Sequence, residues 1–150
     1  MRKIFSFVLL LTLSGCATVD VPKYIQDKNP YKKIFYASFD ETLSAAKKTL
    51  EHYGWTILND YDPTVFEQNK ELGTPEAKQI LLFTEDRQTP FFLGSSYSRI
   101  NAYVRTVDKT STEVELRYVT VASVPFKTFN TYKNDRVIHH IFDAIGAAVK

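Results

Sequence analysis

The chain has 150 residues, with 19 lysines and arginines against 17 aspartates and glutamates, and it contains one cysteine. A single cysteine excludes a disulfide framework, and a formal charge of +2 gives no electrostatic basis for holding nucleic acid. A hydrophobic content of 44% is too high for a disordered chain and sufficient to bury the core of one domain.

Residues 1–15 have the parts of a signal peptide. Arg2 and Lys3 give a positive start, residues 4–13 form an apolar run, and two small residues close the segment. As a helix, the apolar run spans only about 15 Å, half the thickness of a bilayer. Because this is too short for a permanent membrane span, we predict a secretory signal peptide.

The segment Leu13-Ser14-Gly15-Cys16 resembles the lipobox of bacterial lipoproteins at all of its positions. The resemblance implies lipidation of Cys16 through a thioether, cleavage before it, and acylation of the new amino group, for example with palmitate. Several acyl chains attach a protein stably to a membrane. In a cell with two membranes, the presence of Ala17 instead of Asp after the cysteine implies export to the outer membrane, with the domain facing the periplasm.

Residues 16–30 are predicted to be the lipidated N-terminus and a flexible tether. The stretch contains Pro22 and Pro30 and shows no sustained periodicity. Fully extended, the tether would reach about 45 Å. We expect a single α+β domain over residues 31–150.

The domain is predicted to open with a strand at 32–39 and a helix that starts from a capping box. The Ser38 side chain accepts from the amide of Glu41, while the Glu41 side chain reaches back to the amide of Ser38. Gly54 is placed to end this helix in the left-handed conformation. Apolar residues that share one side of the helix are Leu43, Ala46, Leu50 and Tyr53.

Three short strands are predicted next. Residues 55–58 and 65–68 are expected to pair across a turn at 59–63, which is rich in Asn, Asp and Pro. A further strand is expected at 79–85.

A long hairpin is the clearest pattern in the chain. The positions that alternate with polar residues and are expected to face the core are Ile100, Ala102 and Val104, and then Val114, Leu116 and Tyr118. Matching the apolar sides requires an odd-length connection around residues 108–110. This register places Arg105 opposite Glu113 or Glu115.

The last predicted element is a helix capped by Asn134 or Asp135. Its buried stripe is expected to be Ile138, Ile141, Phe142, Ile145, Ala148 and Val149. The element order is then β-α-β-β-β-β-β-α, with links between strands too short for crossover helices. We therefore predict a two-layer α+β fold, a largely antiparallel sheet with two helices packed on one face.

The segment at 51–67, EHYGWTILNDYDPTVFE, resembles small envelope lipoproteins with a helix-grip-like domain, as in the BamC family of the outer-membrane β-barrel assembly machinery. The shared pattern is a helix ending near Leu50, then Gly54, an apolar strand and an Asp-rich turn. Outside this region the resemblance extends only to the order of elements. It implies the fold and an accessory role in the envelope, without membership of that machinery.

No catalytic or metal-binding constellation is evident in the sequence. The histidines that fall into no metal-ligand spacing are His52, His139 and His140. His139 stands one helical turn from both Asp135 and Asp143, which we interpret as an ordinary solvated pairing. Asp60 and Asp62 are interpreted as turn residues instead of calcium ligands. We predict no catalytic residue, no metal and no cofactor, and a protein that is not an enzyme.

An unusual apolar run, Phe91, Phe92 and Leu93, lies between Pro90 and Gly94 in a segment expected to be a loop. These side chains would insert into the bilayer interface beside the lipid anchor, or dock a protein partner. The alternative is that they fold back over an open end of the sheet or form a short edge strand.

The function predicted from the sequence is a membrane-anchored envelope lipoprotein that acts by binding. It would serve as a non-catalytic accessory module in outer-membrane assembly or maintenance, with an envelope protein as its partner. The alternative is a carrier or sensor of an apolar ligand, held in a cavity between helices and sheet that is lined by Trp55, Phe83 and Phe142.

Overall fold

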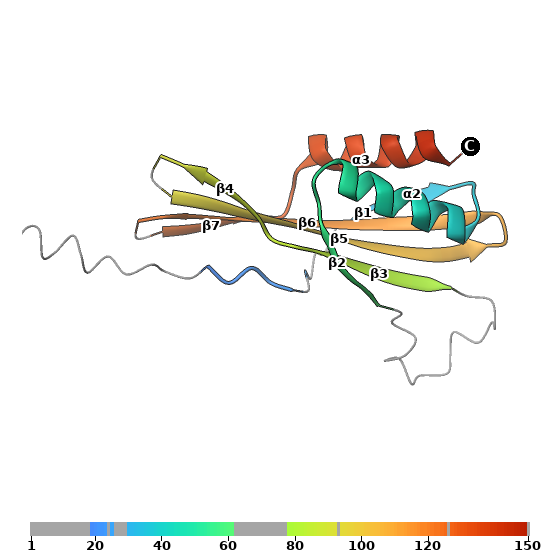
Figure 1. Cartoon of the computed structure of the whole chain (residues 1–150), viewed down its shortest axis with the longest axis horizontal. Helices are drawn as coiled ribbons and strands as arrows, with labels where there is room; N and C mark the ends of the chain where they lie inside the picture. Colours follow the sequence, from blue (N-terminus) through green and yellow to red (C-terminus); the bar gives the residue numbers. More distant parts are fainter. Residues whose placement is uncertain are drawn as a thin grey trace, which may run out of the picture.

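The computed structural model describes residues 19–23, 25, 30–61, 78–92, 94–125 and 127–149 (Figure 1). Its described residues form one antiparallel sheet of seven strands, with two helices lying over one of its faces. The elements are β1 (Tyr31–Phe35), α2 (Phe39–His52), β2 (Ile57–Tyr61), β3 (Gln79–Thr84), β4 (Arg87–Phe91), β5 (Gly94–Asp108), β6 (Ser111–Val124), β7 (Lys127–Thr131) and α3 (Asp135–Ala148). The predicted two-layer α+β fold is confirmed.

The long hairpin of β5 and β6 is the centre of the sheet. Its register pairs the predicted core positions with one another, as Ile100 with Tyr118, Ala102 with Leu116 and Val104 with Val114. Arg105 lies opposite Glu113, and their side chains form an ion pair of 2.5 Å between Nη2 and Oε1. The register predicted from the alternation is therefore confirmed.

The two halves of this hairpin have different neighbours. In the half next to the β5–β6 turn, the strand order is β1-β6-β5-β3-β2. In the other half, β4 pairs with β5 and β7 pairs with β6. Figure 1 shows this second half reaching beyond the region that the helices cover.

The number of strands differs from the prediction. The described chain has six strands after α2, because β4 and β7 were expected to be loop and trailing segment. Every residue of both strands is exposed, so neither shows the alternation by which a strand is recognised in a sequence. The predicted strand at 65–68 lies outside the described residues, and β2 pairs with β3.

Both helices begin where the sequence predicts. Ser38 and Glu41 form the capping box of α2, and Gly54 follows that helix with a φ of 77°. The Asn134 side chain caps α3 by accepting from the amide of Val137. The buried helical residues are Thr42, Ala45, Ala46, Thr49 and Leu50 in α2 and Ile138, Ile141, Phe142 and Ile145 in α3. Tyr53 and Ala148, at the ends of the two predicted stripes, are exposed.

One side of β5 pairs with β3 at residues 101–105 and with β4 at residues 94–98, and a threonine side chain forms hydrogen bonds to β5 between these two stretches. The Thr84 hydroxyl donates to the carbonyl of Ile100 at 2.8 Å and lies 3.2 Å from the Ile100 amide, which donates to it. Ile100 and Thr84 are both fully buried, so water is not available to the main-chain groups of Ile100 in place of this hydroxyl. The Thr84 hydroxyl thereby takes the place of main-chain hydrogen bonds at the point where the neighbour of β5 changes from β3 to β4.

We predict that Gly94→Ala destabilises the protein by about 1–3 kcal/mol, because the new Cβ would lie 1.9 Å from the main-chain oxygen of Ser123. The control is Gly146→Ala in α3, where the Cβ meets only Phe35 Cε1 at 3.5 Å, and where alanine favours a helix by up to about 1 kcal/mol. Urea denaturation of both variants measures the difference. Equal stabilities would show that β5 and β6 do not approach so closely at this point.

Candidate functional site

The first described segment of the chain lies against the face of the sheet opposite the helices (Figure 1). We call residues 19–23 and 25 the strap. Val21 and Ile25 are buried, and they pack on Val119 and Val121 to form an apolar cluster separate from the main core. Partly buried residues at the edge of this cluster are Val19 and Tyr97.

Side chains of β5 and β6 hold the strap by its main-chain carbonyl groups. The hydrogen bonds run from Arg99 Nη1 to Pro22 O (3.2 Å), from Asn101 Nδ2 to Lys23 O (3.0 Å) and from Arg117 Nη1 to Ile25 O (2.9 Å). Arg99 is itself buried and donates through Nε to Asp86 Oδ1 at 2.7 Å. An irregular segment thus finds hydrogen-bond partners without adding a strand to the sheet.

This arrangement corrects the expectation of a flexible tether over 16–30, at least for its described part. Only two of the strap's side chains, Val21 and Ile25, are buried, and Pro22 follows the first. A segment with two inward residues has no detectable period, and donors that lie far along the chain leave no trace in its own sequence. The strap is therefore part of the domain.

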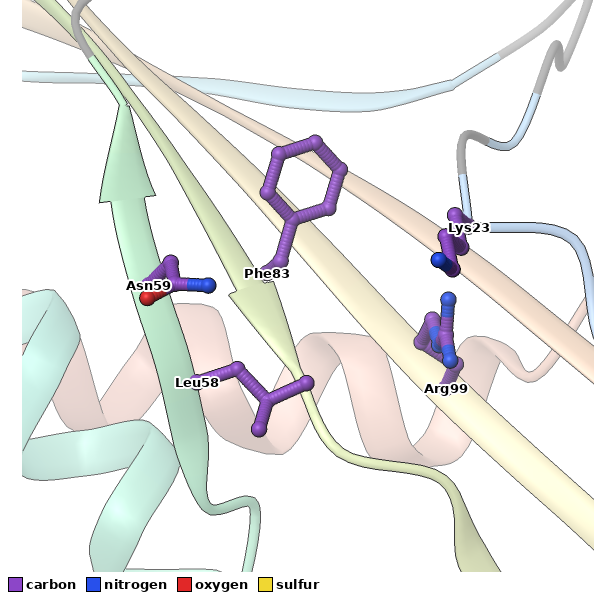
Figure 2. A pocket seen from close by; sticks show the side chains of 5 residues that line it. All are labelled: Lys23, Leu58, Asn59, Phe83 and Arg99. Atoms are coloured by element: carbon purple, nitrogen blue, oxygen red, sulfur yellow. The ribbon is translucent and has the colours of Figure 1, made fainter.

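A pocket of about 380 Å³ opens beside the strap on the same face of the sheet (Figure 2). Figure 2 shows Lys23 of the strap and Arg99 of β5 pointing toward one another on one side of it. The residues on its other side are Leu58, Asn59 and Phe83 of β2 and β3. Apolar walls next to two cations suit a ligand with an apolar body and an anionic group.

The predicted cavity between helices and sheet is wrong in its lining. Trp55 and Phe142 are buried in the main core, where the Trp55 ring meets Tyr118 edge-on with centroids 6.4 Å apart. Phe83 lies in the pocket on the opposite face. On β3 the buried inward positions belong to Leu82 and Thr84, and the period of two places Phe83 outward.

A second surface is formed by the part of the sheet that extends beyond the two helices. We call it the hairpin extension, and it consists of β4, Phe92 in the turn that follows, residues 94–98 of β5, residues 120–124 of β6, and β7. Phe92, at its tip, is 98% exposed, while Phe91 and Phe129 are 43% and 47% exposed. The pairing of Phe91 with Gly94 and of Phe129 with Ala122 sets the last two aromatic rings beside small residues.

The hairpin extension carries no negative charge. Segments 87–98 and 118–133 contain the cations Arg87, Lys127 and Lys133 and neither aspartate nor glutamate. Arg87 is engaged with the core, because its guanidinium lies 5.8 Å from the centre of the Trp55 ring. Lys127 lies over Phe129, with 4.7 Å between Nζ and the ring centre. The surface is therefore aromatic, polar and weakly basic.

The candidate contact residues have mixed outcomes. Phe91 ends β4 and Phe92 follows in the turn to β5, so the segment is an edge strand and turn instead of a loop, and both side chains are exposed. Leu93 and the predicted lipidation site Cys16 lie outside the described residues. The sequence predicts the tip as a contact surface. Phe129 stands out in the sequence only as part of an apolar cluster that continues beyond the predicted hairpin, which favours burial, whereas the structure exposes it on β7.

The acidic residues considered as functional candidates in the sequence form ordinary ion pairs and hydrogen bonds with neighbouring side chains. Asp143 pairs with Lys33 at 3.3 Å, and Asp135 accepts a hydrogen bond from the hydroxyl of Tyr31, so both acids beside His139 have other partners. A 2.7 Å hydrogen bond from Lys47 Nζ holds the pKa of Asp60 below its usual range. Among the described residues, no three His, Cys, Asp or Glu side chains gather as metal ligands.

The main-chain amide of Thr110 likewise lowers the pKa of Asp108, in the β5–β6 turn. Both lowered pKa values belong to exposed carboxylates with local partners. An exposed ion pair such as Lys47–Asp60 contributes only about 0–1 kcal/mol to stability. Neither group is set up for proton transfer.

Comparison with known proteins returned no match to a family model, to a curated protein or to a solved structure. Within the described part of the chain, no helix is long and apolar enough to cross a membrane. The strap, the pocket and the hairpin extension are therefore interpreted from their own geometry.

We predict that Ile25→Ala lowers the free energy of unfolding by about 2–4 kcal/mol, because a fully buried aliphatic side chain leaves a cavity when it is truncated. The matched control is Ile34→Ala on β1, where the side chain is 48% exposed and the loss should stay below about 1 kcal/mol. Chemical denaturation measures both. If the two losses are equal, the strap is not packed on the sheet in solution.

Proposed function

We propose that the chain is a lipid-anchored envelope protein that acts as a non-catalytic binding or accessory module in outer-membrane assembly or maintenance. The strap is the observation that supports this proposal. Cys16, the proposed site of lipidation, precedes Val19 by three residues, and three residues extend at most about 11 Å. A lipid on Cys16 would therefore hold the sheet close to the membrane.

Because the strap is packed on the sheet, a short link to the anchor would also restrict the orientation of the domain. A flexible tether of 45 Å would let the domain point in any direction, whereas a strap fixed at Val21 and Ile25 ties one face of the sheet to the anchor. The surfaces next to it are the pocket and the hairpin extension. Both are suited to binding, one for a small amphipathic ligand and one for a broad surface.

We predict that Cys16→Ser abolishes acylation and releases the protein from membranes, because serine provides no thiol for the thioether. Intact-mass spectrometry of the purified protein and flotation of membranes measure the two effects. The control is Ser6→Ala in the same signal peptide, which should leave both unchanged. Recovery of a mature protein with an unmodified Cys16 would contradict the proposal.

A second candidate function, carriage of an apolar ligand, is favoured by the pocket. Phe83 and Leu58 would contact an alkyl chain, and Lys23 and Arg99 would hold a carboxylate or phosphate at its end. Arg99 is kept in place by Asp86 and by the strap carbonyl of Pro22, so the cation is pre-oriented.

We predict that the protein binds a fluorescent long-chain fatty acid and that Lys23→Glu abolishes this binding. The substitution leaves the Lys23 carbonyl in place to hold the strap, and it reverses only a charge at the rim of the pocket. Lys109→Glu, in the exposed β5–β6 turn, is the charge-matched control. Equal affinity of the two variants would rule out the pocket as the binding site.

A further inference from the structure

We infer that the hairpin extension rests in the interface of an anionic lipid surface, beside the lipid anchor. The inference deepens the proposed function, and it rests on the lipidation of Cys16. It assigns a direction to the domain: the exposed aromatic residues of β4 and β7 face the membrane, and the β5–β6 turn points away from it.

The direction of the strap is the first step. Pro22 is bound by Arg99 and Lys23 by Asn101, so the chain moves away from the tip of β5 as it proceeds. Toward its N-terminal side the strap therefore runs toward the hairpin extension. Val19 and Tyr97 both pack against the apolar cluster of Val119 and Val121, so the start of the strap and the first part of β5 share this cluster. Figure 1 shows the strap beneath the sheet, with its N-terminal end on the side of β4 and β7.

Chain lengths give the second step. Tyr97 is three residues from Gly94, at the start of β5, which is about 10 Å along a strand. Cys16 is three residues from Val19, at most about 11 Å away. Because the strap runs toward the hairpin extension, a lipid attached at Cys16 would be held on the same side of the domain as the tip. The tip would then be within reach of the bilayer that holds the anchor.

The chemistry of the surface is the third step. Peripheral membrane proteins bury apolar side chains such as phenylalanine at the boundary between headgroups and acyl chains, and lysines near an anionic leaflet are attracted to its headgroups. Phe91, Phe92 and Phe129 supply the first feature, and Lys127 and Lys133 supply the second. The strap adds Asp20 and Lys23, which offset one another.

The opposite end of the molecule is different. Tyr36, after β1, is 90% exposed there, but acidic and basic side chains are mixed at that end of the sheet. Asp40 pairs with Lys78 and Glu113 with Arg105, and the remaining acids, Glu41 and Asp108, share this end with Lys109. An anionic surface would therefore attract the hairpin extension, whose charged residues are all cations, more strongly than this nearly balanced end. A protein partner at the tip would explain the exposed rings but not their position next to the anchor.

The test measures quenching of tryptophan fluorescence by brominated acyl chains in vesicles that carry the lipidated protein. Trp55 is the only tryptophan and is buried in the core, so it supplies a constant background. The variants are Phe92→Trp at the tip and Tyr36→Trp as the matched control at the far end. Vesicles contain phosphatidylglycerol with phosphatidylethanolamine, or phosphatidylcholine alone.

We expect the tryptophan introduced at position 92 to lose emission on phosphatidylglycerol vesicles and the one introduced at position 36 to keep it. Lys127→Glu in the Phe92→Trp background should reduce the loss, whereas Lys109→Glu should not. Equal quenching at positions 92 and 36, or none at either, would overturn the inference. Quenching at position 92 that does not depend on phosphatidylglycerol would overturn its anionic part.

The same samples separate this inference from the proposed function. Protein that fails to float with the vesicles lacks the anchor, which refutes the proposed function itself. Protein that floats without quenching at position 92 keeps the anchor and refutes only the contact of the hairpin extension. Photo-crosslinking from position 92 in cells gives an independent reading: adducts to lipid agree with it, and a reproducible adduct to one protein would overturn it.

Discussion

The antiparallel pairing of β5 with β6 is the interaction on which the other parts of the structure depend. Its inward side chains form the floor on which α2 and α3 pack, and its outward side chains hold the strap. A helix of 14 residues is only about 21 Å long, whereas a strand of 15 residues spans about 50 Å. Two helices of that length cannot cover the whole hairpin. The uncovered part is the hairpin extension, which is therefore a consequence of strand length.

The two faces of the sheet are stabilised by different means. Toward the helices, the core cluster consists of aliphatic and aromatic residues, with a few buried threonines such as Thr42, Thr49 and Thr84 among them. Toward the strap, a small apolar cluster is combined with charged and amide donors from Arg99, Asn101 and Arg117. The polar side chains of this face suit contact with water where the strap does not cover it, and they bind the strap where it does. The pocket lies at the edge of the covered part, between Lys23 of the strap and the side chains of β2 and β3.

The sequence predicts those parts of the fold that leave a local pattern. The capping box of Ser38 and the Arg105–Glu113 register follow from side chains within one or two elements, and both are confirmed. β7 is not predicted from the sequence, and β4 is foreseen only in the alternative of a short edge strand at residues 91–93. The side chains of both strands are all exposed, and their pairing depends on the backbones of β5 and β6. The packing of the strap could not be predicted for a related reason, because the side chains that bind it lie far along the chain. Of the candidate site, Phe91 and Phe92 could be found from their unusual position between Pro90 and Gly94. Phe129 belongs to an apolar cluster in the sequence, and its exposure could not be predicted because it depends on the pairing of β7 with β6.

The strap also sets an order of events for the newly made chain. The donors that hold it follow their acceptors by 77, 78 and 92 residues, and the last of them is in β6. None of these bonds can form until about two thirds of the chain has been made, and the full set also needs Arg117 of β6, because the N-terminus is made first and the residues that bind it are made much later. In that interval the donors that hold the strap do not yet exist, so the proposed cleavage and acylation at Cys16 would not compete with docking of the strap. Under the proposed function, attachment of the lipid would then come before the domain takes a defined orientation on the membrane.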